Sequence, residues 1–133
     1  MKEKLVDKEK LTPSLICRIH EFLCRGCYDE SRWAKGERPG EFKKNYYGVG
    51  LPVGVPPENV EEEISYICKE IEGAKLRSTL DVLKPAVRFH CNFERIHAFA
   101  DGNVRVRRSL LKYMNILSGV YDTNTNQVFF DHL

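Results

Sequence analysis

The sequence has little of what would place the chain in a membrane or on a nucleic acid. Its formal net charge is only +2, since 21 lysines and arginines offset 19 aspartates and glutamates. So small an excess gives no reason to expect a nucleic-acid or membrane partner. No apolar run approaches the about 18 residues of a membrane span. The opening residues, Met1-Lys2-Glu3-Lys4, are charged where a secretion signal would be apolar.

The cysteines are too few and too irregularly spaced to cross-link the chain by disulfides. The five cysteines are odd in number and form no disulfide framework, so we expect a reducing, cytoplasmic location. With 42% hydrophobic and 30% charged residues, the 133-residue chain has the composition of a globular protein and the length of one domain. We therefore expect a single domain over residues 1–133, which buries about two-thirds of the surface of its unfolded chain.

One face of a predicted helix carries four residues of types that can bind metals, Cys17, His20, Cys24 and Cys27. On a helix that rises about 1.5 Å per residue, Cys17 and Cys27 would lie about 15 Å apart. That distance is too long for one ion whose bonds to sulfur measure about 2.3 Å. We therefore expect all four residues on the buried, apolar stripe of the helix.

Apolar residues recur at the helical period, which predicts an all-α fold. The expected helices cover about residues 12–28, from 57 onward, about 79–99 and about 105–118. Thr12 and Pro13 supply an N-cap and an N1 proline to the first helix, Pro85 is expected to bend the third, and Gly119 suits the end of the fourth. The inward positions of the first two helices are Ile16, Ile19, His20, Leu23 and Cys27, then Val60, Ile64, Ile67, Cys68 and Ile71.

Two stretches lack the helical period. Residues 31–50 are punctuated by glycine and proline, which predicts a loop or hairpin. Residues 120–133 are expected to form a short hairpin over Asp122-Thr123-Asn124.

The third predicted helix is expected to be the central one, with His97 near its end. Its inward positions share an arc of about 120°, the width of a core-facing stripe. They are Ala86, Phe89, His90, Phe93, Ile96, His97 and Ala100, with Arg88, Asn92 and Arg95 opposite. We interpret His90 as a core residue. A metal site of His90, Glu94 and His97 fits the helical spacing but lacks a fourth ligand.

The segment richest in chemistry is residues 97–108, HAFADGNVRVRR. A histidine and a carboxylate precede a Gly-Asn turn, and three arginines follow where the last helix begins. Cations in a first helical turn oppose the macrodipole, at a cost of about 0.3–1 kcal/mol each. Their presence therefore favours an anion bound at the free N–H groups of the turn. Arg105 and Arg108 would point to one side and clamp phosphate oxygens, whereas Arg107 would face away as a solvated surface charge.

At these residues the chain resembles the Fic (filamentation induced by cAMP) family, whose signature is H-P-F-x-[D/E]-G-N-G-R-x-x-R. The matching positions are His97, Phe99, Asp101, Gly102, Asn103, Arg105 and Arg108. Ala98 stands in place of the signature's proline, and Val104 in place of its second glycine. Residues 36–43, GERPGEFK, look like the family's flap hairpin, so the likeness covers roughly residues 12–118.

The resemblance implies a compact Fic helical core with one β-hairpin flap over about residues 36–50. It implies that His97 is a general base that takes the proton of a target hydroxyl. The matching acid, Asp101, would hold Mg²⁺ against the phosphates of ATP, and Phe99 would anchor the turn to the core.

The rest of the motif would bind phosphate. Gly102, Asn103 and the backbone of Val104 would form a concave anion nest. Arg105 and Arg108 would neutralise charge as pyrophosphate leaves. The implied reaction is transfer of AMP from ATP to a serine, threonine or tyrosine hydroxyl of a target protein.

The flap resemblance implies a protein partner. Family members pair an extended segment of the target with the flap edge, in the manner of an added β-strand. The corresponding residues here are Gly40, Glu41, Phe42 and Lys43. An ordinary exposed loop is the alternative interpretation of the same stretch.

Val104 leaves the reaction open. Glycine at this place allows positive φ and a close approach of the backbone to phosphate, whereas a β-branched valine resists positive φ and adds two methyl groups. The related Doc toxins carry lysine there and transfer a phosphoryl group. The alternatives are therefore AMP transfer, Doc-like phosphoryl transfer, and a weakly active scaffold that binds a partner or nucleotide.

Many Fic proteins are inhibited by a helix that carries [S/T]-x-x-x-E-[G/N]. The nearest stretch is residues 68–73, CKEIEG, in which Cys68 replaces the hydroxyl residue. Its Glu72 fits an amphipathic helix equally well. The chain is then either unrestrained, inhibited by a separate protein, or inhibited by a segment that the sequence does not contain.

Overall fold

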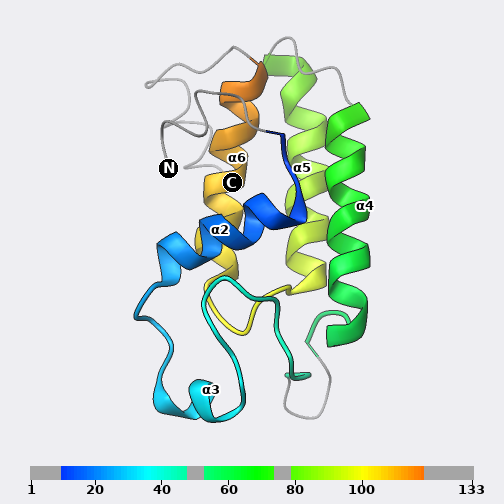
Figure 1. Cartoon of the computed structure of the whole chain (residues 1–133). Coiled ribbons are helices and arrows are strands. Elements are labelled where there is room, and N and C mark those ends of the chain that lie inside the picture. Colours follow the sequence, from blue (N-terminus) through cyan, green and yellow to red (C-terminus); the bar gives the residue numbers. More distant parts are fainter. Residues whose placement is uncertain (1–9, 48–52, 74–78, 119–133) are drawn as a thin grey trace.

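The chain folds as packed helices, and the computed structural model describes residues 10–47, 53–73 and 79–118. The elements are α2 (Pro13–Cys24), α3 (Glu30–Ala34), the 3₁₀ turn η1 (Pro57–Asn59), α4 (Val60–Gly73), α5 (Thr79–Ile96) and α6 (Asn103–Ser118). Helix α5 lies between α4 and α6 and contacts both, while α2 crosses in front of α6 and also contacts α4 (Figure 1). The all-α class is confirmed for the residues that the structure describes.

Helix α2 begins where the sequence predicts and ends earlier. The Thr12 side chain accepts a hydrogen bond from Leu15 N–H, and Pro13 occupies the first turn. The helix ends at Cys24 because Arg25 (φ −58°, ψ 123°) and Gly26 (φ 78°) form a type II turn. The predicted end near residue 28 is therefore wrong.

The early end of α2 changes the surroundings of Cys27. This residue is exposed, and the prediction that it lies on the buried stripe is wrong. The chain then forms α3, whose N-cap Asp29 accepts from Arg32 N–H. The sequence predicts only loop or hairpin from residue 31 because five residues are too few to show a helical period.

The predictions for the second and third helices are largely confirmed. Pro56 precedes η1 and Pro57 is its first residue, and α4 itself begins at Val60 with its five predicted inward residues buried. Pro85 lies inside α5. The predicted stripe of α5 is also confirmed: Ala86, Phe89, Phe93 and Ile96 are buried, and His90, His97 and Ala100 are half-buried.

Helix α6 begins at Asn103, two positions before the predicted start, and buries Val106, Leu110, Leu111 and Tyr113. Gly119 and the hairpin expected over 120–133 lie outside the described residues. None of the described helices is both long and apolar enough to cross a membrane.

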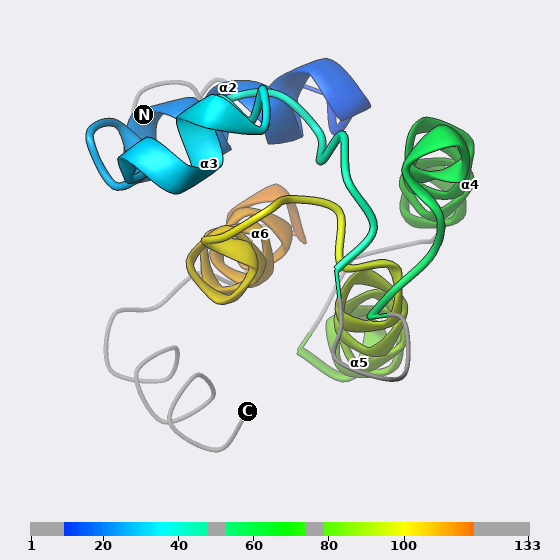
Figure 2. The ribbon, with the colours of Figure 1, turned by 90° about the horizontal axis from the view of Figure 1, so that it is seen from below.

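The predicted β-hairpin flap is not seen as strands in the described part of residues 36–50. The observed pairing is one isolated antiparallel bridge between Tyr47 and Val53, in which Val53 N–H donates to Tyr47 C=O at 2.6 Å. Residues 48–50 fall outside the described ranges. Residues 36–47 and the α5–α6 connection lie at the lower end of α5 and α6 in Figure 1, and the view from below in Figure 2 shows both in front of the helices.

Candidate active site at the α5–α6 turn

His97 ends helix α5. Its N–H still donates to Phe93 C=O at 3.3 Å, but its φ of 52° is left-handed and stops the helix. Among the described residues other than glycine, none besides His97 has positive φ. Histidine tolerates this region better than most residues, so the backbone aims the imidazole out of the helix without a large penalty.

The stretch after the Tyr47–Val53 bridge packs against His97. Val55 N–H donates to Ile96 C=O at 3.1 Å, which brings Gly54 over the end of α5. A Cβ on Gly54 would lie 2.5 Å from His97 Cβ. Sequence reasoning missed Gly54, because a glycine that is needed for close approach gives the same signal as a glycine in any loop.

Burial lowers the pKa of His97 below the ordinary histidine value, and the nearby Lys43 ammonium lowers it further, while Asp101 raises it. The imidazole is therefore neutral near pH 7, where a ring nitrogen can accept a proton. The structure thus gives His97 the protonation state that a general base needs.

Lys43 is a buried cation beside this histidine. Its backbone N–H donates to Ala98 C=O at 2.9 Å, and its ammonium donates to Val53 C=O at 3.2 Å. Burial lowers the pKa of Lys43, and Glu37 raises it. Both polar ends of Lys43 are thus bonded within the chain.

Asp101 lies four residues after His97 with its carboxylate 55% exposed. Its Oδ1 accepts from Gly102 N–H at 2.8 Å, and its Oδ2 is 3.7 Å from Arg32 Nη2. No cluster of three or more histidine, cysteine, aspartate or glutamate side chains that could hold a metal occurs in the described ranges. One exposed carboxylate suits Mg²⁺, which is commonly held by one or two carboxylates together with substrate phosphates and water.

The turn that follows is shaped by Gly102 and closed by Asn103. Gly102 has a φ of 84°, and a Cβ there would meet the Cys24 sulfur well inside van der Waals contact. The Asn103 side chain accepts from Phe99 N–H at 2.9 Å and donates to Phe99 C=O at 2.8 Å. The amide of Asn103 therefore closes the turn through both polar groups of Phe99.

Val104 lies in the first turn of α6 with 47% of its surface exposed. Its φ is not positive, so the conflict between valine and a left-handed backbone does not arise. No side chain in the described ranges accepts from the N–H groups of Val104 or Arg105, and the first intrahelical bond runs from Val106 N–H to Gly102 C=O at 3.2 Å. These first-turn N–H groups are the ones that bind anions at helix N-termini.

The three arginines have different surroundings. Arg105 Nη1 donates to Cys27 Sγ at 3.3 Å, and Arg108 is exposed with no acidic partner among the described residues. Arg107 donates to Glu94 Oε1 at 2.8 Å, and only 12% of its side chain is exposed. The prediction that Arg107 is a solvated surface charge is wrong, because α6 packs against α5 and brings it to Glu94.

His20 joins three parts of the site, and this role was missed. The imidazole is fully buried and stacks on Phe99 with ring centroids 3.8 Å apart. Its Nδ1 accepts from Gly40 N–H at 2.9 Å, so the proton resides on Nε2, which donates to Asp101 C=O at 2.8 Å. The apolar stripe of α2 predicted that His20 is buried, but the pattern carries no signal for partners so far along the chain.

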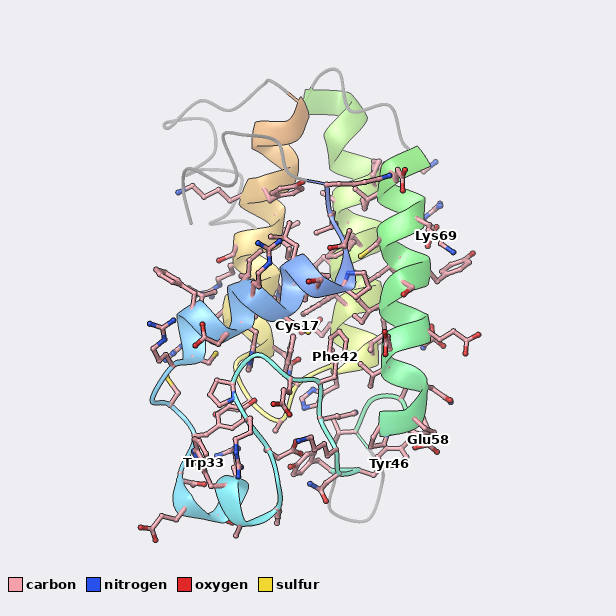
Figure 3. All side chains as sticks on the ribbon, in the orientation of Figure 1. Cys17, Trp33, Phe42, Tyr46, Glu58 and Lys69 are labelled. Atoms are coloured by element: carbon pink, nitrogen blue, oxygen red, sulfur yellow. The ribbon has the colours of Figure 1, made fainter. Side chains whose placement is uncertain are left out.

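The residues predicted to dock the target protein make contacts within the chain. Gly40 bonds to His20, Phe42 packs on Phe99 at 5.3 Å, and Glu41 is exposed and paired with Lys44. In Figure 3 the labelled Phe42 lies below α2, whereas Trp33 and Tyr46 lie at the outer end of the molecule. The N–H groups of Gly40, Glu41, Lys43 and Lys44 all donate within the chain.

A separate cavity of about 270 Å³ lies between α4 and α5. Its lining residues are Ile67, Glu70, Ile71, Lys84, Pro85, Arg88, Phe89 and Asn92. None of them belongs to the α5–α6 turn, so this cavity is separate from the candidate site.

The sequence is similar to known proteins. The family model described as "Fic/DOC family" matches residues 10–114. A protein of Aquifex aeolicus (strain VF5), named as a probable protein adenylyltransferase, is 32% identical over 113 residues, which is 85% of this chain. The chain spans about a third (32%) of that relative's length. No solved structure gives a significant match.

Proposed function

Because the chain belongs to the Fic/DOC family, we propose that it is a protein adenylyltransferase that moves AMP from ATP to a serine, threonine or tyrosine hydroxyl of a target protein. An adenylyltransferase-type function at the level of the family is supported by the relative's name. The observation that carries the proposal for this chain is the position of His97, whose pKa is lowered by burial and by Lys43, at the end of α5 and directly before the turn that contains Gly102.

In the proposed reaction His97 accepts the proton of the target hydroxyl through a neutral ring nitrogen. The hydroxyl oxygen then forms a bond to the α-phosphorus, and the bond from that phosphorus to the bridging oxygen of pyrophosphate breaks. The N–H groups of Val104 and Arg105 face the phosphate oxygens, together with the positive end of α6. The guanidinium of Arg108 neutralises charge on the leaving pyrophosphate.

Asp101 is the residue that would hold Mg²⁺ in this proposal. Bound Mg²⁺ supplies Lewis-acid polarisation of the phosphate oxygens. The hydrogen bond from Gly102 N–H fixes one carboxylate oxygen, and Arg32 faces the other at 3.7 Å. Arg32 also lies beside Asp29, at 3.6 Å, so it has a second carboxylate to turn to when Asp101 binds a cation.

The target protein is proposed to dock on the flap. Since the N–H groups of Gly40, Glu41, Lys43 and Lys44 are already bonded within the chain, we place the docking edge at Tyr46 and Tyr47. Tyr46 is exposed, and its hydroxyl donates to Gly54 C=O at 3.1 Å. Gly40, Phe42 and Lys43 then form the flap base, the part of the flap that fixes the docking edge relative to His97. Inhibition by a separate protein is part of the same proposal.

Val104 is the observation that favours a second candidate, phosphoryl transfer of the Doc kind. The side chain projects from the first turn of α6 next to the anion site, where the family signature has glycine. Its methyl groups would change the position of a bound triphosphate and thereby the phosphorus that faces the hydroxyl. A scaffold that binds nucleotide or partner without turnover is the candidate from outside the enzymes.

Incubation with ATP labelled on the α- or the γ-phosphate, with cell lysate proteins as acceptors, tests the proposal. We expect protein-bound label from the α-phosphate alone, and only when Mg²⁺ is present. Label from the γ-phosphate alone would replace AMP transfer by phosphoryl transfer. Label from neither, with an ATP analogue still bound in calorimetry, would favour the scaffold.

A further inference from the structure

Cys24 and Cys27 are the first and last residues of a type II turn. Cys27 N–H donates to Cys24 C=O at 3.0 Å, and the residues between them have the φ values of a type II turn, −58° at Arg25 and 78° at Gly26. Such a turn brings the outer Cα atoms within about 7 Å, and disulfides form across Cα separations of about 4.4–6.8 Å. Closing the pair therefore requires side-chain rotation and little backbone movement.

The two thiols differ in access. Cys27 is exposed, whereas Cys24 is buried with 1% of its surface accessible. Burial raises the pKa of the Cys24 thiol, and the charge of Cys27 raises it further, so the two sulfurs interact electrostatically. In a dithiol of this kind the accessible sulfur reacts first with an external disulfide, and the buried sulfur resolves the mixed disulfide.

One sulfur contacts the α5–α6 turn and the other contacts the first turn of α6. Cys24 Sγ occupies the space where Gly102 would carry a Cβ. Cys27 Sγ accepts a hydrogen bond from Arg105 Nη1 at 3.3 Å. No third histidine, cysteine or carboxylate joins the pair to form a metal-binding cluster in the part of the chain that the structure describes.

We propose that Cys24 and Cys27 are a redox pair that closes to a disulfide by exchange with a low-molecular-weight disulfide, and that closure releases Arg105 and withdraws the Cys24 sulfur from Gly102. The Cys27 thiolate attacks one sulfur of oxidised glutathione, and glutathione thiolate leaves. The Cys24 thiolate then attacks the Cys27 sulfur of the mixed disulfide and expels the second glutathione thiolate. The two glutathione molecules take up the protons that the two cysteines lost.

Closure changes the anion-binding turn in two ways. Arg105 loses its acceptor on Cys27, and Gly102 loses the sulfur that packs against it. The consequence for nucleotide rests on the proposed function: the oxidised chain binds an ATP analogue more weakly than the reduced chain. The redox chemistry itself does not depend on any nucleotide.

The first test follows the thiols of the full chain in glutathione redox buffers, with alkylation and mass spectrometry. In the wild type we expect the thiols of Cys24 and Cys27 to be lost together, with no glutathione adduct retained on either residue. Cys24→Ser is expected to keep the adduct on Cys27, and Cys27→Ser to gain little adduct on buried Cys24. Cys91→Ser removes an exposed cysteine elsewhere and serves as the matched control. A stable adduct on wild-type Cys27, or no reaction there, overturns the pair.

The second test asks whether the pair is coupled to the turn. Arg105→Met removes a hydrogen bond that only the reduced form makes, so the equilibrium is expected to shift towards the disulfide by about threefold or more. Arg107→Met, which leaves Cys27 untouched, is the control. If half of the pair is oxidised at the same glutathione redox ratio in Arg105→Met as in the wild type, the pair is not coupled to the turn.

Calorimetry with a non-hydrolysable ATP analogue completes the test. We expect several-fold weaker binding to the oxidised wild type, and equal binding to Cys27→Ser before and after the oxidising treatment. Equal affinity of both wild-type forms overturns the effect on nucleotide. If the reduced chain does not bind the analogue, the proposed function is wrong, and the thiol measurements still decide the redox pair.

Discussion

The imidazole of His20 is hydrogen-bonded through Nε2 to the backbone carbonyl of Asp101 at 2.8 Å, although the two residues are 81 positions apart. The same ring accepts from Gly40 N–H through Nδ1 at 2.9 Å and stacks on Phe99. Since both ring nitrogens are used, the neutral tautomer is fixed, in agreement with the lowering of the pKa of His20 by burial. One buried side chain of α2 thus sets the position of the flap base relative to the α5–α6 turn.

Replacing His97 should remove activity and leave the fold intact. His97→Asn keeps a residue that tolerates the left-handed backbone at φ 52° but cannot act as a base near neutral pH. Loss of general-base catalysis is expected to lower AMP incorporation by a factor of about 10² to 10⁴. The measurement is label from α-phosphate ATP, with circular dichroism to follow the fold. His90→Asn, one heptad earlier on α5, should label at the wild-type rate, and an equal loss in both variants would remove His97 from the role of base.

The pH profile should report the environment of His97. Only the neutral imidazole accepts a proton, so activity is expected to fall as the pH drops through a pKa that burial and Lys43 hold below the ordinary value of about 6.5. Lys43→Met removes the cation, so the acidic limb should move to higher pH. Ring ¹⁵N resonances of His97 give the same pKa without turnover. Lys44→Met, an exposed neighbour, should not move it, and a limb that shifts to lower pH in Lys43→Met contradicts the assignment.

Two glycines with similar φ separate backbone strain from steric conflict. Gly102→Ala and Gly26→Ala both place alanine in the left-handed region, at 84° and 78°, which costs about 1–2 kcal/mol. A Cβ on Gly26 meets nothing within 4 Å, whereas one on Gly102 runs into the Cys24 sulfur. We therefore expect Gly102→Ala to lower the free energy of unfolding by about 1–3 kcal/mol more, from overpacking. Equal losses in urea denaturation would show that Cys24 does not confine the turn.

Arg108 and Arg107 should differ in what their loss affects. Arg108 is exposed beside the proposed phosphate site, so Arg108→Ala is expected to weaken binding of an ATP analogue about tenfold, as expected for a charge-assisted hydrogen bond. Arg107 is largely buried against Glu94, so Arg107→Ala should lower stability by about 1 kcal/mol and leave the affinity nearly unchanged. Calorimetry and thermal unfolding on both variants separate the two effects. Equal losses of affinity would contradict the assignment of Arg108 to the phosphate.

Val104→Gly should raise AMP transfer. Removal of the two methyl groups lets the phosphate approach the first-turn N–H groups of α6 and restores the family signature. Because glycine is unfavourable within a helix, the free energy of unfolding should fall by about 0.5–1 kcal/mol. Val87→Gly, at an exposed position of α5, gives the stability effect alone. Unchanged or lower incorporation at saturating Mg²⁺-ATP would favour Doc-like transfer or the scaffold.

Much of the helical core is predictable because the spacing of apolar residues along one helix identifies the face that is buried. The inward positions of α4 and α5 were identified from spacing, and the order of the residues from His97 to Arg108 was sufficient to indicate phosphate chemistry. The errors fall where one contact overrides the local pattern. A type II turn at Gly26 ends α2 early and exposes Cys27, and helix packing turns Arg107 towards Glu94.

The sequence by itself therefore determined which segments become helices and which stretch predicts phosphate chemistry, since both depend on neighbours within a few positions. The tertiary structure alone decided what surrounds that motif. Cys24 lies against Gly102, His20 reaches Asp101, and Lys43 lies near His97. These relationships depend on how α2 and the flap base pack over the end of α5. Packing between distant segments is set by the shapes of all the buried side chains together, and no local pattern records it.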